Sequence, residues 1–414
     1  MKKDYDVIVI GAGHAGIEAA LAAARLGVST LVFVMDLRAV GFMACNPAIG
    51  GTAKGHIVRE IDALGGEMGL SADAALLQIK MLNRGKGPAV HCLRGQEDKL
   101  IYGRIMLKKL NDAPNLTVTE GEVTDILTSD GRVCGAVTRD GATVGARAVV
   151  VASGVYLNSR IIIGEESRLE GPSGFGRATG LTEALRNLGL DIRRFKTGTP
   201  ARIAKDSIDF SEMQIQEGES DIHCFSHLTD GGLLRQEPCY LTYTNEETHR
   251  IIKDNISRSP LYNGAIKGVG PRYCPSIEDK VMRFDKERHQ VFIEPEGRDS
   301  EEMYVQGMSS SLPRDVQERV YRSVRGLENA RILRYAYAIE YDCIDARALY
   351  NTYAVKHVGG LYTAGQINGS SGYEEAAAQG LIAGINAALY VQNKPSFTLS
   401  RSDAYIGVLT DDLV

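Results

Sequence analysis

The segment Gly11-Ala12-Gly13-His14-Ala15-Gly16 follows the apolar run Val7-Ile8-Val9-Ile10 and opens an alanine-rich stretch. The pattern predicts a strand over 5–10, a helix over 14–26 and a second strand over 29–34. In such a β-α-β unit the first glycine permits a tight turn, the second lets the backbone approach a pyrophosphate, and the third lets helix and strand pack closely. The phosphates would lie at the helix N-terminus, where free N–H groups attract negative charge. This segment therefore predicts a dinucleotide-binding site.

Size and composition indicate a globular α/β protein of two or three lobes. The chain has 414 residues, 44% of them hydrophobic and 24% charged, with 45 glycines. A chain of this length exceeds one ordinary domain and can bury a large core. No apolar stretch is long enough to span a membrane. The start, Met1-Lys2-Lys3-Asp4-Tyr5-Asp6, leads directly into the first strand and leaves no room for a signal peptide, so we expect a cytoplasmic protein.

The cysteine spacing and the net charge argue against several classes of protein and of site. The seven cysteines have irregular spacing and no CxxC pair, so we expect free thiols, and we expect no metal site. The net charge of −5 argues against non-specific coating of nucleic acid. Two basic clusters are open to two interpretations, as ion-pair partners at the surface or as a phosphate-binding face. They are Lys80, Arg84 and Lys86, and Arg193, Arg194, Lys196 and Arg202.

Further segments extend the predicted nucleotide unit. Asp36 lies twenty residues past Gly16, where an acidic group often binds a ribose hydroxyl, although a solvated aspartate at a strand end is the alternative. Short β runs at Leu116–Val118, Val123–Leu127 and Val133–Thr138, separated by Asp-Gly turns, predict a three-stranded meander. A buried strand over 148–152 follows. This order resembles the two-dinucleotide-binding flavoprotein fold, in which the flavin domain is discontinuous in sequence.

The return to that domain is predicted near the far end of the chain. Gly360-Leu361-Tyr362-Thr363-Ala364-Gly365-Gln366 precedes a small-residue helix that starts at Tyr373 and runs to Ala388. The alanines and glycines of this helix would let it press against a sheet or a cofactor. We therefore predict an FAD-binding domain over 1–200 and 331–414, and an inserted α+β lobe over 201–330.

Several longer motifs closely resemble the MnmG (GidA) family of flavin-dependent tRNA uridine modification enzymes. The likeness runs from residue 5 to the C-terminus. The motifs are Gly11–Gly16, Ala44-Cys45-Asn46-Pro47-Ala48-Ile49-Gly50-Gly51, Lys196-Thr197-Gly198-Thr199-Pro200, Gly270–Lys280, Gly365–Gly369 and Gly372–Glu375.

The resemblance implies an activity. With the GTPase MnmE, the family adds a carboxymethylaminomethyl or aminomethyl group at C5 of the wobble uridine of certain tRNAs. Methylene-tetrahydrofolate supplies the carbon, FAD is the redox cofactor and NADH the reductant. The resemblance also implies a homodimer. Family members continue beyond the end of this chain into a helical region associated with docking of tRNA and of the GTPase, so we expect weakened tRNA docking here.

The same resemblance assigns catalytic residues. C5 of uracil is a poor nucleophile until a group adds to C6, and a thiolate suits that addition. Cys45 and Cys274 resemble the catalytic thiols of the family, whereas Cys92, Cys134, Cys224, Cys239 and Cys343 are interpreted as structural. Glu278 or Asp279 could move the C5 proton, and Arg272 or Lys280 could lower the thiol pKa, although an ion-pair network is the alternative.

Cofactor contacts are assigned in the same way. Two interpretations stay open for Lys54 and His56: they could contact a phosphate or the folate, or they could be surface residues. The Gly270–Phe284 stretch is associated with nicotinamide nucleotide binding, through Gly270, Pro271, Arg272, Tyr273, Arg283 and Phe284. The expected flavin contacts are Gly11 to Gly16, Asp36, Val123, Thr182, Gly365 and Gln366.

Two stretches depart from the family pattern, Gly171–Arg177 around the Thr182 assignment and Tyr304–Ser309, where Gln306 stands in place of the usual asparagine. The chain length also fits the shorter folate- and flavin-dependent tRNA uracil methyltransferase, TrmFO, whose product is a methyl group. The motifs around Cys45 and Gln366 favour the MnmG family. A flavin-binding paralogue without catalytic turnover is the third interpretation.

Overall fold

The computed structural model describes residues 4–220, 224–230, 235–270 and 275–414. Its first unit is built on a parallel sheet in the strand order β21-β10-β1-β2-β6. Strand β1 (Val7–Ile10) lies between β2 (Thr30–Val34) and β10 (Ala148–Val151), and every residue of these three strands is buried. Parallel strands covered on both faces read as continuous apolar runs, which explains the sequence pattern. Strand β21 (Leu361–Thr363) pairs with β10, so the sheet is discontinuous in sequence as predicted.

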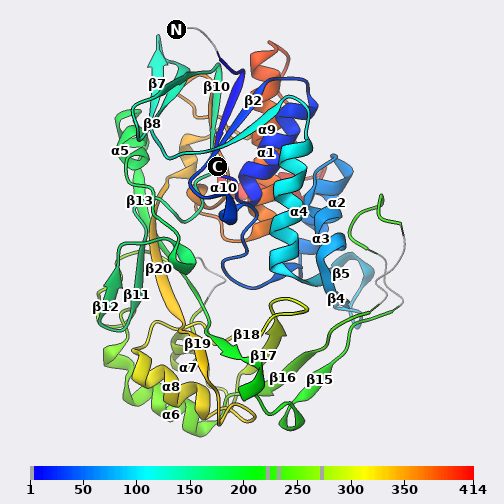
Figure 1. Cartoon of the computed structure of the whole chain (residues 1–414), viewed down its shortest axis with the longest axis vertical. Helices are drawn as coiled ribbons and strands as arrows, with labels where there is room; N and C mark the ends of the chain where they lie inside the picture. The colour runs from blue at the N-terminus through cyan, green and yellow to red at the C-terminus, as the bar shows by residue number, and fades with distance from the viewer. Residues whose placement is uncertain (1–3, 221–223, 231–234, 271–274) are drawn as a thin grey trace.

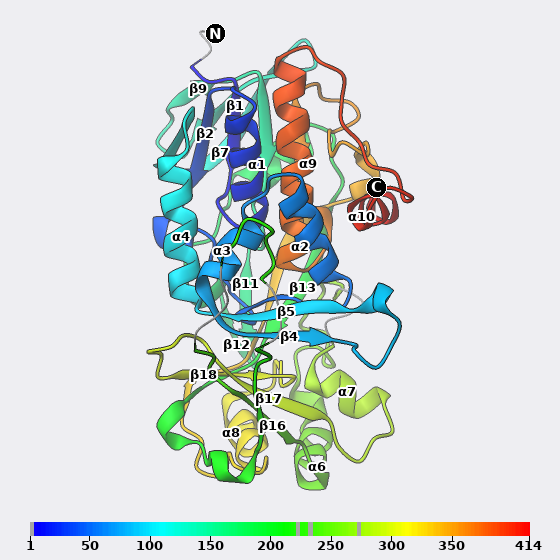
Figure 2. The same cartoon turned by 90° about the vertical axis from the view of Figure 1, so that its right-hand side faces the viewer.

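Helices α1 (His14–Arg25) and α9 (Tyr373–Val391) pack against each other beside this sheet (Figure 2). A Cβ atom built at Gly380 would lie 2.0 Å from the Ala15 carbonyl oxygen, and one at Gly384 would lie 2.2 Å from that of Ala19. Any side chain larger than hydrogen would therefore push the two backbones apart. The small residues of α9 serve this contact with α1.

One predicted strand was assigned to the wrong sheet. Strand β6 (Leu116–Glu120) does not belong to the meander but pairs in parallel with β2 at the edge of the main sheet. Helix α4 (Lys99–Asp112), which is not among the elements predicted above, leads into it, and parallel pairing requires such a crossover. The meander consists instead of β7 (Val123–Ser129), β8 (Arg132–Thr138) and β9 (Thr143–Gly145).

A second sheet joins the upper and lower parts of the molecule (Figure 1). Its strands β13 (Ile192–Thr199) and β20 (Tyr337–Ile344) pair antiparallel over their full length. Strands β11 (Arg160–Ile163) and β12 (Glu166–Arg168) complete it. Because β13 leads into the inserted lobe and β20 leads out of it, residues at the start of the lobe lie close to residues at its end.

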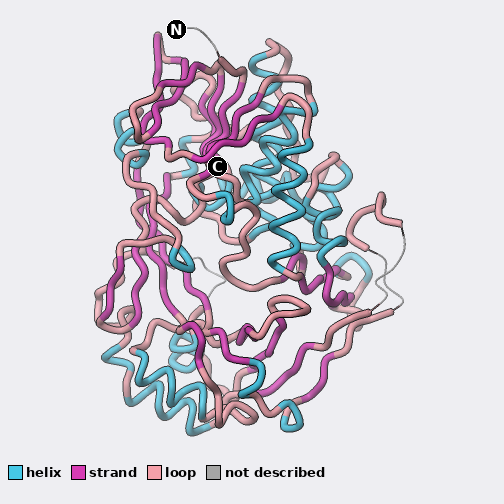
Figure 3. Tube along the Cα trace, in the orientation of Figure 1, coloured by secondary structure: helices cyan, strands magenta, loops and turns pink. Residues whose placement is uncertain are grey.

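The inserted lobe has its own hydrophobic core, centred on Ile203, Ile293 and Val305. A six-stranded sheet forms one layer, and helices α6, α7 and α8 pack around it, with α6 and α8 at the bottom in Figure 3. The α+β lobe predicted from sequence is therefore present. The exact domain boundaries at residues 200 and 331 stay a prediction. The lobe's elements are β14 (Arg202–Ala204), β15 (Gln214–Gln216), β16 (Cys239–Tyr243), α6 (Glu246–Asp254), α7 (Ile277–Arg283), β17 (Gln290–Pro295), β18 (Glu302–Gln306), α8 (Arg314–Arg322) and β19 (Ile332–Arg334).

A small sheet and four short helices complete the first unit. Strands β3 (Ala48–Gly50), β5 (Cys92–Glu97) and β4 (Leu76–Leu82) form the sheet that lies above the inserted lobe in Figure 2. The helices are α2 (Lys54–Ala63), α3 (Met68–Ala75), α5 (Leu181–Asn187) and α10 (Tyr405–Leu413). In the described part of the chain, none of the helices has both the length and the apolar character needed to cross a membrane.

Candidate active site

The three glycines of the first turn have the geometry that a dinucleotide requires. Gly11 has a φ of +103°, and a Cβ there would lie 2.3 Å from the Ala152 carbonyl oxygen. A Cβ at Gly16 would lie 1.8 Å from the Gly11 carbonyl oxygen, so this glycine permits the close packing of α1 on the turn. A Cβ at Gly13 would meet no atom within 4 Å. The middle glycine therefore leaves its backbone open to an approaching phosphate.

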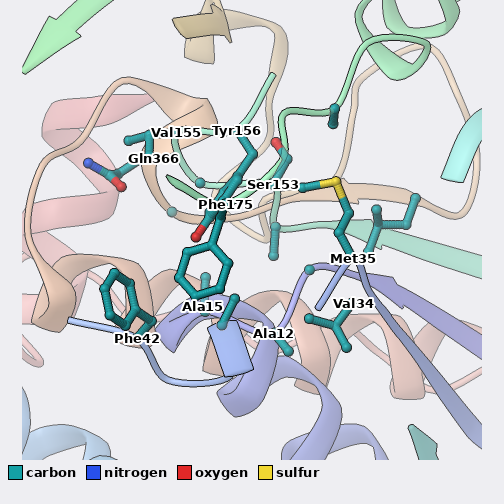
Figure 4. Close-up of a pocket in the computed structure, with 18 of the residues that line it drawn as sticks. Ala12, Ala15, Val34, Met35, Phe42, Ser153, Val155, Tyr156, Phe175 and Gln366 are labelled. Carbon is teal, nitrogen blue, oxygen red and sulfur yellow. The ribbon is translucent and has the colours of Figure 1, made fainter. Parts of the chain in front are cut away.

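Gly13 opens into a cavity at the carboxyl ends of β1, β2, β10 and β21, which we call the glycine-loop cavity. Its volume is about 1300 Å³ including its open mouth. Figure 4 shows Ala12 and Ala15 of the α1 turn on one side, with Phe42 and Phe175 next to each other. Ligands of open α/β sheets bind at this end of the strands. The wall is formed by residues within 10–15, 33–44, 121–123, 152–156, 172–181, 364–366 and 372–376.

Two polar groups of the cavity wall are buried without a partner. Among the described residues, neither His14 Nε2 nor Ser153 Oγ has a hydrogen-bond partner. The His14 ring stacks between Tyr373, at 4.5 Å between ring centroids, and Tyr102, at 5.6 Å. Burial lowers the pKa of His14 to about 3, so the ring is neutral at physiological pH. Since buried polar atoms are nearly always hydrogen-bonded, these two point to a bound polar ligand.

Asp36 lies in the cavity wall at the end of β2, where sequence placed it. Its carboxylate accepts from the Arg38 backbone N–H at 2.8 Å and from the Arg38 guanidinium at 2.9 Å. This guanidinium holds the pKa of Asp36 below its ordinary value. A ribose hydroxyl at this position would therefore meet an ionised carboxylate that Arg38 already orients.

The return segment brings a helix N-terminus to the same cavity. Gly365, Gln366 and Tyr373 lie in its wall. The backbone N–H of Gly365 donates to Gln379 Oε1 at 2.9 Å, which fixes the turn against α9. Gly372 caps α9 without a side-chain hydrogen bond, so its first N–H groups are not capped by a side chain. Anions and other polar ligands bind well at such a helix end.

Cys45 lies next to this cavity, one residue after the wall residue Ala44. The side chain is half-buried, and its sulfur lies 3.1 Å from the phenol oxygen of Tyr304 and 3.8 Å from the Gly198 carbonyl oxygen. The Cys45 backbone N–H donates to the Tyr373 hydroxyl at 2.8 Å. The sulfur is thus held between the first unit and the inserted lobe.

Arg202 contacts the Cys45 loop, and sequence reasoning missed this position. The pattern placed it in a basic cluster, but it is 2% exposed and all its N–H groups are used. It lies two residues after the Lys196–Pro200 motif, a signal that could have separated it from the cluster. Its guanidinium donates to Glu296 Oε1 at 2.9 Å, Thr199 Oγ1 at 2.7 Å, Pro200 O at 3.0 Å, Ala44 O at 3.1 Å and Cys45 O at 3.2 Å.

Its basic neighbours in sequence have other roles. Arg193 pairs with Asp345, and Arg194 with Asp342 at 2.8 Å, so these two arginines are ion-pair partners. In the first cluster, Arg84 pairs with Glu219 at 2.5 Å.

Lys54 and His56 have protein partners. Lys54 Nζ lies 3.2 Å from Glu374 and 3.8 Å from Glu375 at the start of α9, and these carboxylates raise its pKa. Glu374 also accepts from the Gly50 backbone N–H at 2.7 Å. The ring of His56 packs against that of Tyr405, with 4.9 Å between centroids. Lys54 therefore ties the Cys45 loop to α9.

The acidic residues of α7 are directed into the inserted lobe. Glu278 is fully buried and accepts from the Ser311 backbone N–H at 3.0 Å and from Ser310 Oγ at 3.1 Å. Burial raises the pKa of Glu278. Asp279 pairs with Arg283 at 3.2 Å, and Lys280 donates to the Gly307 carbonyl at 2.9 Å. These contacts tie the three side chains to the lobe, and their catalytic roles stay a prediction.

Cys274, Pro271, Arg272 and Tyr273 lie outside the described residues. The residues that flank them approach the Cys45 site. Gly270 lies beside Lys196, where a Cβ would be 2.9 Å from the lysine Cε. The Ile277 backbone N–H donates to the Ser309 carbonyl at 2.7 Å, and Ser309 Oγ adjoins Gly198. One flank therefore meets β13 at Lys196, and the other meets it through Ser309, near the carbonyl that contacts the Cys45 sulfur.

Of the other predicted cofactor residues, one lies in the wall of the glycine-loop cavity and the rest lie elsewhere. Val123 is in the cavity wall. Thr182 donates instead to Asp342 at 3.0 Å, because its hydroxyl faces β20. Phe284 ends α7 and is 52% exposed. Among the described residues that sequence assigned to a cofactor, the wall of the glycine-loop cavity does not include Gly16, Thr182, Gly270, Arg283 or Phe284.

The cysteines interpreted as structural include three buried ones, Cys92, Cys239 and Cys343. Burial raises the pKa of Cys239 and of Cys343 to about 12. A thiol with so high a pKa is a poor nucleophile at neutral pH. Cys45 differs from these two by its position beside the cavity.

The family model, the relatives and the solved structures that match this chain all point to the same family. A family model described as glucose inhibited division protein A matches residues 6–395. The tRNA uridine 5-carboxymethylaminomethyl modification enzyme MnmG of Caldicellulosiruptor saccharolyticus is 61% identical over 412 residues, covering 99% of this chain and 66% of the relative. The MnmG of Clostridium botulinum strain Okra is 60% identical with the same coverage. The chain thus spans about two thirds of the length of these relatives.

The same family appears among solved structures. Aquifex aeolicus GidA in its form I crystal has a TM-score of 0.95 and 49% sequence identity, covering all of this chain and 70% of that one. The form II crystal gives a TM-score of 0.94 at 47% identity. The architecture is the two-dinucleotide-binding flavoprotein fold expected from sequence. The chain therefore belongs to the glucose inhibited division protein A (GidA, MnmG) family.

Proposed function

We propose that this chain carries the catalytic core of an FAD-dependent enzyme that adds a carboxymethylaminomethyl or aminomethyl group at C5 of the wobble uridine of tRNA. The relatives that are about 60% identical are named for this modification. The observation that carries the proposal is the Cys45 sulfur, which contacts the Gly198 carbonyl oxygen and the Tyr304 hydroxyl beside a cavity shaped for a dinucleotide. A soft nucleophile next to a redox cofactor matches the chemistry of this reaction.

The glycine-loop cavity fits FAD by its own groups. The open backbone at Gly13 and the first turn of α9 can receive a pyrophosphate, and the neutral His14 and Ser153 Oγ offer hydrogen bonds that are otherwise unused. Asp36 would bind the ribose of the adenosine half. When bound, FAD would supply redox equivalents, received from NADH, for reduction at the transferred carbon.

Cys45 would supply the nucleophile for uracil. Addition of a thiolate to C6 raises electron density at C5, which then forms a bond to the methylene carbon of methylene-tetrahydrofolate while the bond from that carbon to a folate nitrogen breaks. Loss of the C5 proton then restores the double bond and expels the Cys45 thiolate from C6. Arg202 and Tyr373 hold the Cys45 backbone at its carbonyl and its N–H, and the sulfur itself contacts the Gly198 carbonyl oxygen and the Tyr304 hydroxyl. Cys274 is proposed as the second catalytic thiol, on its motif and on the position of its flanking residues.

The proposals for the reductant and for the partners are supported only by membership of the family. We propose NADH as reductant, acting near the Gly270–Phe284 stretch, and the GTPase MnmE, tRNA and a second copy of the chain as partners. A cytoplasmic location belongs to the same proposal. Asp279 and Lys280 remain candidates for proton transfer at the Cys274 motif. Glu278 remains one as well, since its Oε1 accepts from Ser310 and Ser311 while its buried Oε2 has no hydrogen-bond partner among the described residues.

Reconstitution tests the proposed function. The purified chain would be incubated with MnmE, GTP, methylene-tetrahydrofolate, FAD, NADH, glycine or ammonium, and unmodified tRNA, with a longer relative as positive control. We expect a carboxymethylaminomethyl or aminomethyl uridine at the wobble position by mass spectrometry. A 5-methyluridine outside the anticodon would instead assign the chain to the TrmFO reaction. FAD binding without any product, while the relative turns over, would contradict catalysis by this chain.

A further inference from the structure

Among the described residues, the hydroxyl of Tyr304 has one hydrogen-bond partner, the Cys45 sulfur. Tyr304 lies on β18 in the inserted lobe and is 1% exposed. Its hydroxyl oxygen is 3.1 Å from Cys45 Sγ. Within the described ranges, the structure gives this hydroxyl no other hydrogen bond. A buried hydroxyl is usually hydrogen-bonded to an oxygen, because carbonyl and water oxygens are stronger acceptors than a thiol. A hydroxyl whose described hydrogen-bond partner is a sulfur is therefore unusual.

The geometry around this pair is fixed from several sides. The Arg202 guanidinium packs on the Tyr304 ring at 4.9 Å, and the same guanidinium donates to the carbonyls of Ala44 and Cys45. Tyr373 accepts from the Cys45 N–H. Neither the phenol nor the backbone of Cys45 can therefore shift without breaking contacts of the other.

The direction of the hydrogen bond follows from ionisation. Burial, and the proximity of Cys45, raise the pKa of Tyr304 well above its ordinary value, so the phenol keeps its proton at any pH at which a thiol ionises. The Gly198 carbonyl can only accept, and it receives the S–H of the neutral thiol at 3.8 Å. When the thiol loses its proton, the phenol O–H remains as a donor to the thiolate, and such charge-assisted bonds are the stronger ones.

In the described part of the chain, the charged and titratable groups around the sulfur come from five elements. Two are cations, Lys54 at the start of α2 and Arg202 on β14, and both interact electrostatically with Cys45. The others are the neutral phenols of Tyr304, Tyr337 and Tyr373 on β18, β20 and α9. Of the three phenols, the Tyr304 hydroxyl is the one that contacts the sulfur.

We propose that Tyr304 is a positioning residue for Cys45, its phenol donating a hydrogen bond that orients the sulfur beside the glycine-loop cavity and that strengthens when the thiol ionises. This inference rests on the proposed function for the use that is made of the thiolate. The contact itself concerns only residues of this chain, so it can be tested without tRNA or FAD turnover.

The test is the pH dependence of Cys45 alkylation. Wild type and Tyr304→Phe would be treated with iodoacetamide over roughly pH 5 to 10, and the Cys45 peptide quantified by mass spectrometry, because thiolates and not thiols react. Phenylalanine keeps the ring under Arg202 and removes only the hydroxyl. Loss of a hydrogen bond to a charged acceptor predicts a midpoint about one pH unit higher and about tenfold slower alkylation at neutral pH.

Tyr321→Phe is the matched control. Tyr321 is equally buried in the same lobe, but its hydroxyl donates to the Met308 carbonyl and accepts from the Ala201 N–H. This variant should leave the Cys45 profile unchanged. Circular dichroism and FAD binding would confirm that both variants fold. If Tyr304→Phe does not fold, site-specific 3-fluorotyrosine at position 304, a stronger donor of the same shape, should move the midpoint to lower pH.

The outcomes separate this inference from the proposed function. An unchanged Cys45 profile in folded Tyr304→Phe, or an unchanged profile with fluorotyrosine, would overturn the role of Tyr304 even if Cys45→Ser abolishes tRNA modification. A shifted profile supports it. If the profile shifts and Cys45→Ser still modifies tRNA, the positioning of the thiolate stands and the proposed catalytic use of Cys45 fails.

Discussion

The loop around Cys45 and helix α7 both carry reactive side chains, but they differ in where those side chains point. The Cys45 sulfur is half-buried beside an open cavity, and its neighbours come from segments more than a hundred residues away. Glu278 of α7 is fully buried, with donors from Ser310 and Ser311. A group of charged residues next to a motif can thus stabilise its own lobe, whereas the site is assembled from distant parts of the chain.

Cys45→Ser is the strongest way to break this comparison. A serine hydroxyl is far less ionised than a thiol at neutral pH, so it cannot replace a thiolate nucleophile. We expect tRNA modification to fall by at least about a thousandfold, with FAD binding retained. The measurement is single-turnover formation of modified uridine. Cys134→Ser, a half-buried cysteine of the β7–β8–β9 meander, is the control and should keep full activity.

His14→Phe tests whether the glycine-loop cavity beside Cys45 binds FAD through His14. Phenylalanine preserves stacking between Tyr102 and Tyr373 and removes the unpartnered Nε2. Loss of one hydrogen bond of about 0.5–1.5 kcal/mol predicts a Kd for FAD weaker by about 2- to 13-fold. Fluorescence titration measures this change. An FAD affinity equal to that of wild type would show that His14 packs the cavity wall without contacting the cofactor.

The difference between the two regions also marks what sequence can predict. The β1–α1–β2 unit and the return strand β21 were predictable because their signals are local, an apolar run followed by glycines at fixed spacing. The small residues of α9 indicated a close approach, but sequence could not tell that the partner was α1. Strand β6 was assigned to the wrong sheet because alternation of apolar residues is the same in either sheet.

The surroundings of Cys45 could not be derived from local pattern. Arg202, Tyr304 and Tyr373 meet there only because β13 and β20 bring the start and the end of the inserted lobe together, and because α9 returns to α1. No periodicity records such long-range contacts. The catalytic assignment of the acidic residues of α7 stays a prediction, and proximity in sequence to Cys274 could not reveal that Glu278 faces the interior of the lobe.

Glu18→Gln sharpens the comparison by testing a buried carboxyl within the first unit. Glu18 Oε1 accepts from the backbone N–H groups of Glu67 and Met68 at 2.8 Å, and burial raises its pKa to about 7 from 4.5. The folded protein thus holds a proton that the unfolded chain releases, so stability is lost as pH rises from about 4.5 to about 7.

Glutamine keeps the accepting oxygen of position 18 and cannot ionise. We expect the free energy of unfolding at pH 8 to rise by roughly 1 to 3 kcal/mol, with little change at pH 5. Urea unfolding at the two pH values measures this. A variant that is destabilised equally at both would mean that the carboxyl is held in its charged form.

Glu278→Gln has the smallest expected effect on tRNA modification. It tests whether α7 belongs to the same site as the Cys45 loop. The glutamine oxygen can still accept from the Ser311 N–H and from Ser310, so the lobe should fold as before. Because a carboxyl directed into the lobe interior cannot reach a substrate proton, we expect tRNA modification to change by less than about twofold, whereas loss of a general acid or base costs about a hundredfold or more. Asp279→Asn, assayed in parallel, changes the neighbouring carboxyl that pairs with the exposed Arg283. A hundredfold loss in Glu278→Gln alone, with unfolding unchanged, would mean that α7 turns its buried acid toward the Cys274 motif during turnover, and the two regions would then form one site.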